Sequence, residues 1–132
     1  MGLLGDLFRT KPKILVVDDD FHVRDLAVDV LSSQGYQVVA AADGLDALAL
    51  LRNYRFSLVI LDVRMPKMDG LEVLESIRAL PGGKDQAVMM LTSEDLSSTI
   101  NRAFELKAVD YILKPFSIKD LLGKVNAHFS PK

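Results

Sequence analysis

Asp18 and Asp19 stand directly after one apolar run of the chain, and Asp62 stands directly after a second one. Thr92 and Lys114 follow two further runs of the same kind. Two carboxylates ~4 Å apart repel by ~4 kcal/mol at an effective dielectric constant of about 20, so three that meet need a cation nearby. Mg²⁺ with several retained waters meets that need, and Lys114 adds a further positive charge. Together these groups could hold a phosphoryl group, because catalysis of phosphoryl transfer is mostly positioning and charge neutralisation.

The segments that must position these residues alternate between short β-branched runs and longer runs of helical period, from Lys13 onward. This alternation is typical of a parallel sheet covered by helices. Most of the expected strands are apolar on successive residues, as strands buried on both faces are. The expected strands cover 14–17, 37–41, 58–61, 87–91 and 109–113. The expected helices have their inward positions within 23–31, 44–53, 71–77, 100–104 and 121–125.

Several of the expected helices have recognisable ends. Gly35 stands where a left-handed C-terminal cap ends the first helix, and Ser117 is a good N-cap for the fifth. The third helix must end at 80–83, where a proline and two glycines follow a leucine. Five right-handed β–α units leave few topologies, and we predict an α/β fold, a doubly wound three-layer sandwich with a parallel sheet.

The candidate residues all fall at the carboxyl ends of the expected strands. In an open α/β sheet, ligands bind in the crevice outside these ends, where the winding of the chain reverses. If strands 14–17 and 58–61 are neighbours, an interstrand spacing of ~4.8 Å places Asp18 or Asp19 beside Asp62. The sequence therefore predicts one site that gathers these carboxylates with Thr92 and Lys114.

The composition describes one domain and excludes several classes of site. The 132 residues include no Cys, which excludes disulfides, thiolate metal ligands and a Cys nucleophile. The formal net charge of -2 argues against a direct nucleic-acid partner. No apolar run approaches the ~20 residues that span a bilayer, so we expect no membrane span and a cytoplasmic protein. We expect the domain to cover 13–130, after an amphipathic extension over 1–12.

Taken in order, these residues and their neighbours resemble the receiver domain of bacterial two-component response regulators. The resemblance covers about 13–129, nearly the whole chain, and includes the single-domain chemotaxis regulators. It implies a flavodoxin-like sheet in the strand order 2-1-3-4-5 with five helices. The motifs that carry it are Asp18-Asp19, Asp62, Met65-Pro66-Lys67-Met68-Asp69-Gly70, Thr92 and Tyr111-Ile112-Leu113-Lys114-Pro115-Phe116.

The resemblance implies a role for each acidic residue. Asp62 would be the nucleophile that accepts a phosphoryl group from a phosphohistidine of a sensor histidine kinase or phosphotransfer protein. The reaction would need Mg²⁺, with Mn²⁺ as a possible substitute. Asp19 would bind the ion directly and Asp18 through a water, while Asp62 and the backbone carbonyl of Arg64 would complete the protein ligands.

The resemblance also implies how the modification is reported. Lys114 would pair with the phosphoryl oxygens, and its peptide bond to Pro115 would be cis. Thr92 would donate its hydroxyl to a phosphoryl oxygen, and Tyr111 would turn inward into the space that Thr92 vacates. The surface of the fourth helix, the fifth strand and the fifth helix would then change for an unidentified downstream protein. The domain would be a signalling switch or relay, and no enzyme beyond its own phosphorylation and dephosphorylation.

Two features lie outside the usual pattern of the family. Lys107 stands at the end of the fourth helix where the family usually places Gly, at a position where a left-handed conformation costs a non-Gly residue of order 1 kcal/mol. Arg64 and Glu94 each lie two residues after a site residue and could pair across the mouth of the site. We hypothesise that this pair slows hydrolysis of the acyl phosphate; the alternative is an exposed pair worth at most ~1 kcal/mol.

Two other functional classes use similar residues. A phosphatase of the haloacid-dehalogenase type also combines an Asp nucleophile with Mg²⁺ and Lys, but its pattern ends in Thr or Val where His22 stands. A nucleotide or flavin binder on the same fold needs a Gly-rich loop after the first strand, where three aspartates would repel phosphate instead. The sequence names neither the kinase nor the output, and it fits a stand-alone module or a piece of a longer protein.

Overall fold

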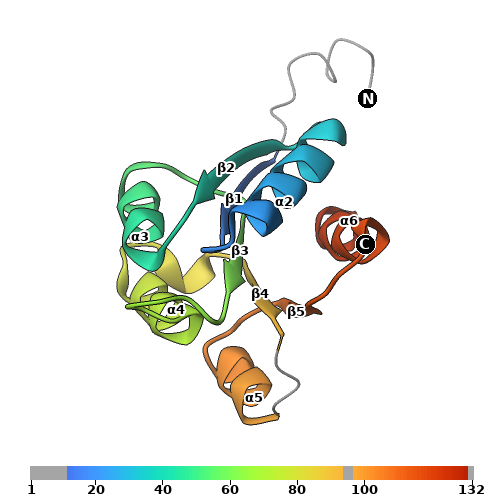
Figure 1. Ribbon diagram of the computed structural model, residues 1–132. Coiled ribbons are helices and arrows are strands. Elements are labelled where there is room, and N and C mark those ends of the chain that lie inside the picture. The colour runs from blue at the N-terminus through green and yellow to red at the C-terminus, as the bar shows by residue number, and fades with distance from the viewer. Residues whose placement is uncertain (1–11, 94–96, 131–132) are drawn as a thin grey trace.

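The computed structural model describes residues 12–93 and 97–130, and in this part of the chain one parallel sheet forms the middle of a three-layer α/β sandwich (Figure 1). The strand order is β2-β1-β3-β4-β5, which confirms the predicted fold. The strands are β1 (Lys13–Val17), β2 (Gln37–Ala41), β3 (Leu58–Asp62), β4 (Val88–Thr92) and β5 (Asp110–Leu113). The helices are α2 (Phe21–Ser33), α3 (Gly44–Asn53), α4 (Gly70–Ala79), the 3₁₀ helix η1 (Gly83–Asp85), α5 (Ser97–Glu105) and α6 (Ile118–Phe129).

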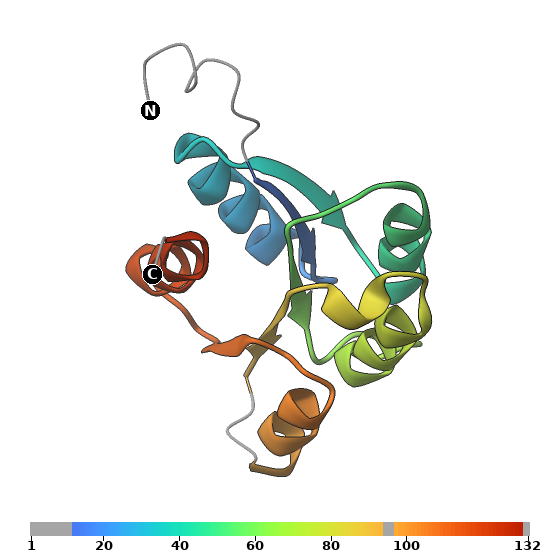
Figure 2. The ribbon, with the colours of Figure 1, turned by 180° about the vertical axis from the view of Figure 1, so that it is seen from behind.

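The two faces of the sheet carry separate cores. Helices α2 and α6 cover one face, and α3, α4 and α5 cover the other, as the views from the front and from behind show (Figures 1 and 2). Successive residues of a strand alternate between the two cores, so Leu15 packs with the α3 side and Val16 with the α2 side. All residues of β3 and β4 are buried, which explains why these strands are apolar on successive positions.

The expected ends of β2 and α3 coincide with the observed ones, and those of the other strands differ by one residue. The largest consequence is at β4, where Thr92 lies inside the strand and pairs with Leu113 of β5. Asp69 and Ser117 are N-caps of α4 and α6, each in a capping box with an acidic residue three positions later. Gly35 has a φ of 92° after the end of α2, as the sequence predicts.

The turn between α5 and β5 keeps the left-handed conformation although Lys107 occupies it. Its φ is 68°, and its backbone N–H donates to the carbonyl of Phe104 while that of Ala108 donates to the carbonyl of Ala103. This pair of bonds is the Schellman arrangement that usually ends in Gly. The unusual residue therefore leaves the path of the turn unchanged and adds a backbone cost of about 1 kcal/mol.

The predicted extension over 1–12 lies outside the described residues apart from Pro12, and it stays a prediction. The first described contacts of the chain belong to the sheet, because the Pro12 carbonyl accepts a hydrogen bond from Gln37 and the Lys13 carbonyl accepts one from Ser57. Among the described helices, none is long and apolar enough to cross a membrane.

Candidate functional site

The register of the sheet brings the predicted residues to one edge. Val17 pairs with Leu61, so Asp18 and Asp62 each stand one position further along neighbouring strands β1 and β3. On the other side of β3, the Lys114 backbone N–H donates to the Thr92 carbonyl at 2.7 Å and joins the ends of β4 and β5. The carboxyl ends of four strands therefore meet where the sequence predicts the site.

Three carboxylates converge at this edge. Asp18, Asp19 and Asp62 each offer one oxygen, and these oxygens lie within 4.8 Å of one another. Asp18 is fully buried and Asp62 is 3% exposed, whereas Asp19 is exposed to solvent. Asp20, the third residue of the acidic run, is separate in function, because its side chain caps α2 by accepting a hydrogen bond from the His22 N–H at 2.8 Å.

These carboxylates suit a hard divalent cation. The Oδ1 atom of Asp18 accepts a hydrogen bond from the Asp20 N–H at 2.9 Å. Its buried Oδ2 atom lies 2.7 Å from Lys114 Nζ in an ion pair and has no other polar partner among the described residues. A buried carboxylate oxygen in this position has bonding capacity left for a further positive group. An oxygen donor set of one exposed and two buried carboxylates fits Mg²⁺.

Lys114 supplies the cation that the site already contains. Its Nζ atom lies 2.7 Å from Asp18 Oδ2 and 3.2 Å from Asp62 Oδ1. Burial lowers the pKa of the Lys114 ammonium, but the hydrogen bond to Asp18 and the negative charges of Asp62 and Asp18 outweigh this effect and raise it. Lys114 therefore stays charged between the two buried carboxylates.

One ammonium does not fully compensate the carboxylates. Burial, and after it the negative charge of Asp18, raise the pKa of Asp62 to about 6 against the opposing influence of Lys114 and of a backbone hydrogen bond from Arg64. A carboxylate whose ionised form is disfavoured in this way is typical of a functional site. A second cation beside Asp62 would favour its ionised form. The electrostatics thus agree with the donor set.

The loop after β3 approaches the site closely at Gly70. A Cβ on this residue would collide with the carbonyl oxygen of Asp62 and lie 2.8 Å from the Cα of Val63. The Gly70 N–H also donates to the Val63 carbonyl at 2.7 Å. Position 70 therefore has no room for a side chain, and this close approach links the start of α4 to the backbone of Asp62.

Thr92 and Tyr111 line a common cavity between β4, β5 and α5. Thr92 is 2% exposed and Tyr111 is half-buried. The cavity has a volume of about 10 Å³, room for about one water. Phe104 of α5 packs edge-on against the Tyr111 ring at 6.2 Å, and Lys124 Nζ lies 5.6 Å from the centre of that ring.

Of the remaining predicted features, the structure describes the cis peptide bond but not the pair between Arg64 and Glu94. The Lys114–Pro115 peptide bond is in the cis form that the resemblance implies. Arg64 is exposed on the loop after β3. Glu94 lies outside the described residues, so the predicted pair between these two side chains stays a prediction.

The sequence interpretation missed one residue that supports the site. Arg24 of α2 donates from Nη1 to the carbonyl of Asp18 at 2.8 Å and lies over the Phe21 ring at 5.8 Å. The signal in the sequence is a basic residue one turn into the helix that follows the acidic run. The sequence does not reveal this role, because an arginine that donates to a backbone carbonyl has the same local sequence pattern as one that points into solvent.

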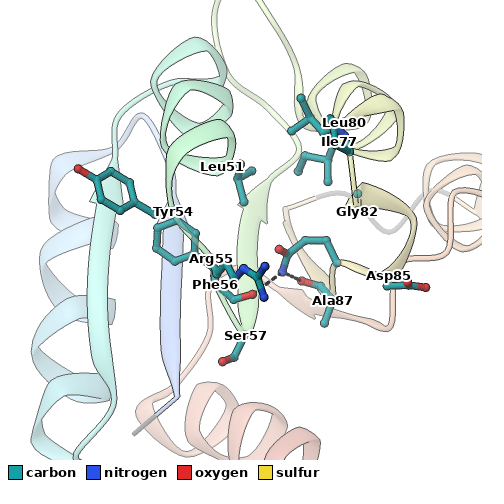
Figure 3. A pocket seen from close by; sticks show the side chains of 13 residues that line it. Leu51, Tyr54, Arg55, Phe56, Ser57, Ile77, Leu80, Gly82, Asp85 and Ala87 are labelled. Carbon is teal, nitrogen blue, oxygen red and sulfur yellow. Dashed lines mark hydrogen bonds between the residues drawn. The ribbon is translucent and has the colours of Figure 1, made fainter. Parts of the chain in front are cut away.

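A second cavity lies at the opposite edge of the sheet, near the amino ends of β3 and β4 (Figure 3). It measures about 430 Å³, and aromatic and aliphatic side chains such as Phe56, Leu51 and Ile77 line it together with Arg55 and Asp85. None of the predicted site residues lines this cavity. The candidate chemistry therefore belongs to the carboxyl ends of the strands.

Known proteins share both this sequence pattern and this geometry. Response regulator MprA of Mycobacterium sp. (strain KMS) is 43% identical over 115 residues, which are 87% of this chain and 49% of MprA. The probable transcriptional regulator ycf27 of Porphyridium aerugineum is 42% identical over 118 residues, which are 89% of this chain and 48% of that protein. The chain thus spans about half the length of these curated relatives.

Solved structures and a family model agree with these relatives. The chemotaxis protein CheY4 of Vibrio cholerae has a TM-score of 0.86 and 33% sequence identity, over 89% of this chain and 98% of CheY4. A CheY-like receiver domain protein from Methanospirillum hungatei has a TM-score of 0.84 and 32% identity, over 90% of this chain and 94% of that one. The model of the response regulator receiver domain matches residues 14–126. The chain therefore belongs to the response regulator receiver domain family, whose members are modules of phosphorylation-dependent signalling.

Proposed function

We propose that this domain is a switch or relay in which Asp62 accepts a phosphoryl group from a phosphohistidine of a sensor histidine kinase or phosphotransfer protein. The observation that carries the proposal is the convergence of the buried Asp18 and Asp62 carboxylates on Lys114 Nζ, with Asp19 exposed beside them. The family supports the same role, since its members are signalling modules. Such a partner would meet the domain in the cytoplasm.

The proposed reaction moves a phosphoryl group from an imidazole nitrogen of the partner's phosphohistidine to a carboxylate oxygen of Asp62. A carboxylate oxygen of Asp62 attacks the phosphorus, the bond from phosphorus to the imidazole nitrogen breaks, and that nitrogen keeps the electron pair and takes up a proton. The product is an acyl phosphate on Asp62. Lys114 lies 3.2 Å from Asp62 Oδ1, where it neutralises charge on the transferred group.

The carboxylates would hold a Mg²⁺ ion during this reaction. Asp19 would bind it directly and Asp18 through a water, with Asp62 and the Arg64 carbonyl as the remaining protein ligands. When bound, the ion neutralises negative charge on the carboxylates and on the phosphoryl oxygens. The raised pKa of Asp62 supports this arrangement, because the carboxylate must be ionised to attack and a cation favours that form.

The proposed response depends on Thr92 and Tyr111. The Thr92 hydroxyl donates to a phosphoryl oxygen, and Tyr111 moves inward toward the cavity that both residues line. Because that cavity holds about 10 Å³, Tyr111 cannot enter it unless Thr92 or α5 shifts. A complete shift from 1:99 to 99:1 needs ~5.5 kcal/mol, which a few charge-assisted hydrogen bonds supply.

The proposed output surface combines α5, β5 and α6. Four large apolar side chains on these elements and their connections are exposed by 42 to 53%: Phe104, Val109, Leu113 and Ile118. Exposed apolar side chains gathered on one surface are typical of a protein-binding site. Tyr111 packs against Phe104 of α5 and lies 5.6 Å from Lys124 Nζ of α6, so a movement of that ring changes what a downstream protein would contact.

The phosphatase alternative conflicts with the geometry at Asp18 and Asp20. The first carboxylate of such a site must reach the substrate, but Asp18 is fully buried with its Oδ2 atom 2.7 Å from Lys114 Nζ, whereas Asp62 keeps an exposed fraction of 3%. The second must be free to donate a proton, but the Asp20 side chain accepts the hydrogen bond that caps α2. We therefore propose no enzyme activity beyond the domain's own phosphorylation and dephosphorylation.

The direct test is labelling with acetyl phosphate in the presence of Mg²⁺, measured by the mass of the intact protein. We expect one phosphoryl group on the parent, none on Asp62→Asn, and none on the parent when EDTA replaces Mg²⁺. Asp29→Asn is the matched control, because Asp29 is exposed on α2 and should leave labelling unchanged. Undiminished labelling of Asp62→Asn would overturn the proposal.

A further inference from the structure

The C-terminal end of α5 is held by a side chain from another helix. Arg78 of α4 donates from Nε to the Leu106 carbonyl at 2.7 Å and from Nη2 to the Lys107 carbonyl at 3.1 Å. These two carbonyls belong to the left-handed turn between α5 and β5. Because carbonyls at a helix end have no partner within the helix, a donor from outside stabilises the turn in its observed shape.

The same guanidinium holds a second segment. Its Nη1 atom donates to the carbonyl of Gly83, the first residue of η1, at 2.7 Å and to that of Gln86, directly after η1, at 2.8 Å. Arg78 is half-buried, and a planar guanidinium with five N–H donors can bind four carbonyls at fixed angles, which an ammonium cannot do. The contacts of Arg78 therefore join α4, the η1 segment and the α5–β5 turn into one unit at the amino ends of β4 and β5.

This unit has a direct connection to the proposed switch. Helix α5 begins after the segment that follows Thr92, and it ends at the turn that Arg78 holds. Tyr111 lies in β5 four residues after Lys107, and Phe104 in the last turn of α5 packs against its ring. A shift of α5 that admits Tyr111 to the cavity must therefore begin at the end near Thr92, while the other end stays fixed.

We propose that Arg78 is a positioning residue that keeps Lys107 in the left-handed conformation and makes the C-terminal end of α5 the fixed point of the switch. The inference rests on the proposed function, since it concerns how α5 responds to the phosphoryl group on Asp62. It explains how this chain tolerates a lysine at a turn that favours Gly. Without the Arg78 contacts, the turn would relax and Tyr111 would lose its defined starting position.

The test follows Tyr111 in protein labelled with 3-fluorotyrosine. The chain has three tyrosines, so three fluorine resonances are expected, and Tyr→Phe variants assign them. Spectra are recorded with Mg²⁺ before and after beryllofluoride, for the parent, Arg78→Gln, Arg78→Lys, Lys107→Gly and Arg78→Gln/Lys107→Gly. Arg102→Gln is the matched control, because this exposed arginine lies on α5 and pairs with Glu105 at 3.1 Å. Labelling by acetyl phosphate is measured on each variant.

We expect Arg78→Gln to shift the Tyr111 resonance before beryllofluoride is added and to reduce the response to it at least twofold. Lys107→Gly in the same chain should restore at least half of the response, because Gly adopts the left-handed conformation without help. Labelling of Asp62 should stay within twofold of the parent, since Arg78 does not contact the site. Arg78→Lys should behave like Arg78→Gln and serves in its place if that variant does not fold.

Three results would contradict the inference in different ways. A parent that takes no phosphoryl group from acetyl phosphate would overturn the proposed function and this inference with it. A labelled parent whose Arg78 variants show the full Tyr111 response, with or without lower stability, would overturn this inference alone. Loss of the response without rescue by Lys107→Gly would contradict the role assigned to the left-handed turn.

Discussion

Buried polar groups are arranged in opposite ways at the carboxyl ends of the strands (the carboxyl-end edge) and at their amino ends (the amino-end edge). At the carboxyl-end edge, Asp18 and Asp62 share one ammonium, and the pKa of Asp62 is raised to about 6 because burial and Asp18 disfavour its charge. At the amino-end edge, one guanidinium satisfies four backbone carbonyls. The first arrangement leaves an excess of negative charge that a ligand can compensate. The second fixes the positions of the backbone segments that it joins. We expect substitutions at the two edges to differ in sign as well as in size.

The largest effect should come from removing the ammonium at the carboxyl-end edge. Lys114→Met leaves the fully buried Asp18 carboxylate without its cation, so we expect a loss of about 3 kcal/mol in the free energy of unfolding without metal. Urea titration in EDTA measures it, with Lys119→Met as an exposed control on α6. Added Mg²⁺ should recover part of the loss, because a cation bound to the folded state stabilises it. A loss below about 1 kcal/mol would show that solvent already compensates Asp18.

Substitutions at two glycines, Gly70 and Gly83, compare the effects of steric crowding at the two edges. A Cβ at Gly70 would collide with the Asp62 carbonyl, and a Cβ at Gly83 would collide with the Ile77 carbonyl. We expect each Gly→Ala change to cost roughly 2 kcal/mol. Only Gly70→Ala should also slow labelling by acetyl phosphate, because it displaces the backbone of Asp62. Gly123→Ala on α6 is the control, since nothing lies within 4 Å of its Cβ position, and it should stabilise the domain by about 0.5–1 kcal/mol.

Equal slowing of labelling by Gly70→Ala and Gly83→Ala would contradict this division. It would mean that the amino-end edge also sets the geometry at Asp62. Urea titrations of all three variants show whether the folded fraction is the same in each labelling reaction, so a difference in rate is not mistaken for a difference in stability.

The carboxyl-end edge was more predictable from the sequence than the amino-end edge. Asp18, Asp62, Thr92 and Lys114 each lie at the carboxyl end of a strand, so a parallel sheet must bring them together whatever the details of packing. The strands and the capping residue Ser117 were also predictable, because periodicity and caps are local signals, and the order of the strands followed from the resemblance. These features depend on neighbours in sequence or on a general rule of the fold.

The contacts of Arg78 could not be predicted in the same way. Two of the four join residues 28 and 29 positions apart, and an arginine near a helix end has the same local signature whether it binds water or a carbonyl. Lys107 shows the same difficulty, since its departure from the usual Gly left the turn uncertain until the partner across space was known. Arg24 and the Asp18 carbonyl are a third case at six residues' separation.

The smallest effect has the most informative sign, because removing a charged group should stabilise the domain. In Asp62→Asn the amide carries no charge to bury beside Asp18, so without metal we expect a gain of about 1–2 kcal/mol at pH 8, measured by urea titration. The folded pKa of Asp62 is about 6 against an ordinary 3.8, so the folded state binds more protons between these values. The parent therefore loses stability as pH rises through this window, and its disadvantage relative to Asp62→Asn should be absent below about pH 4. Mg²⁺ should stabilise the parent more than the variant and narrow the gap, because it restores the compensation that Lys114 alone does not provide. A variant less stable than the parent at pH 8 would mean that the Asp62–Lys114 pair is a net stabilising contact, and that the two edges differ only in size.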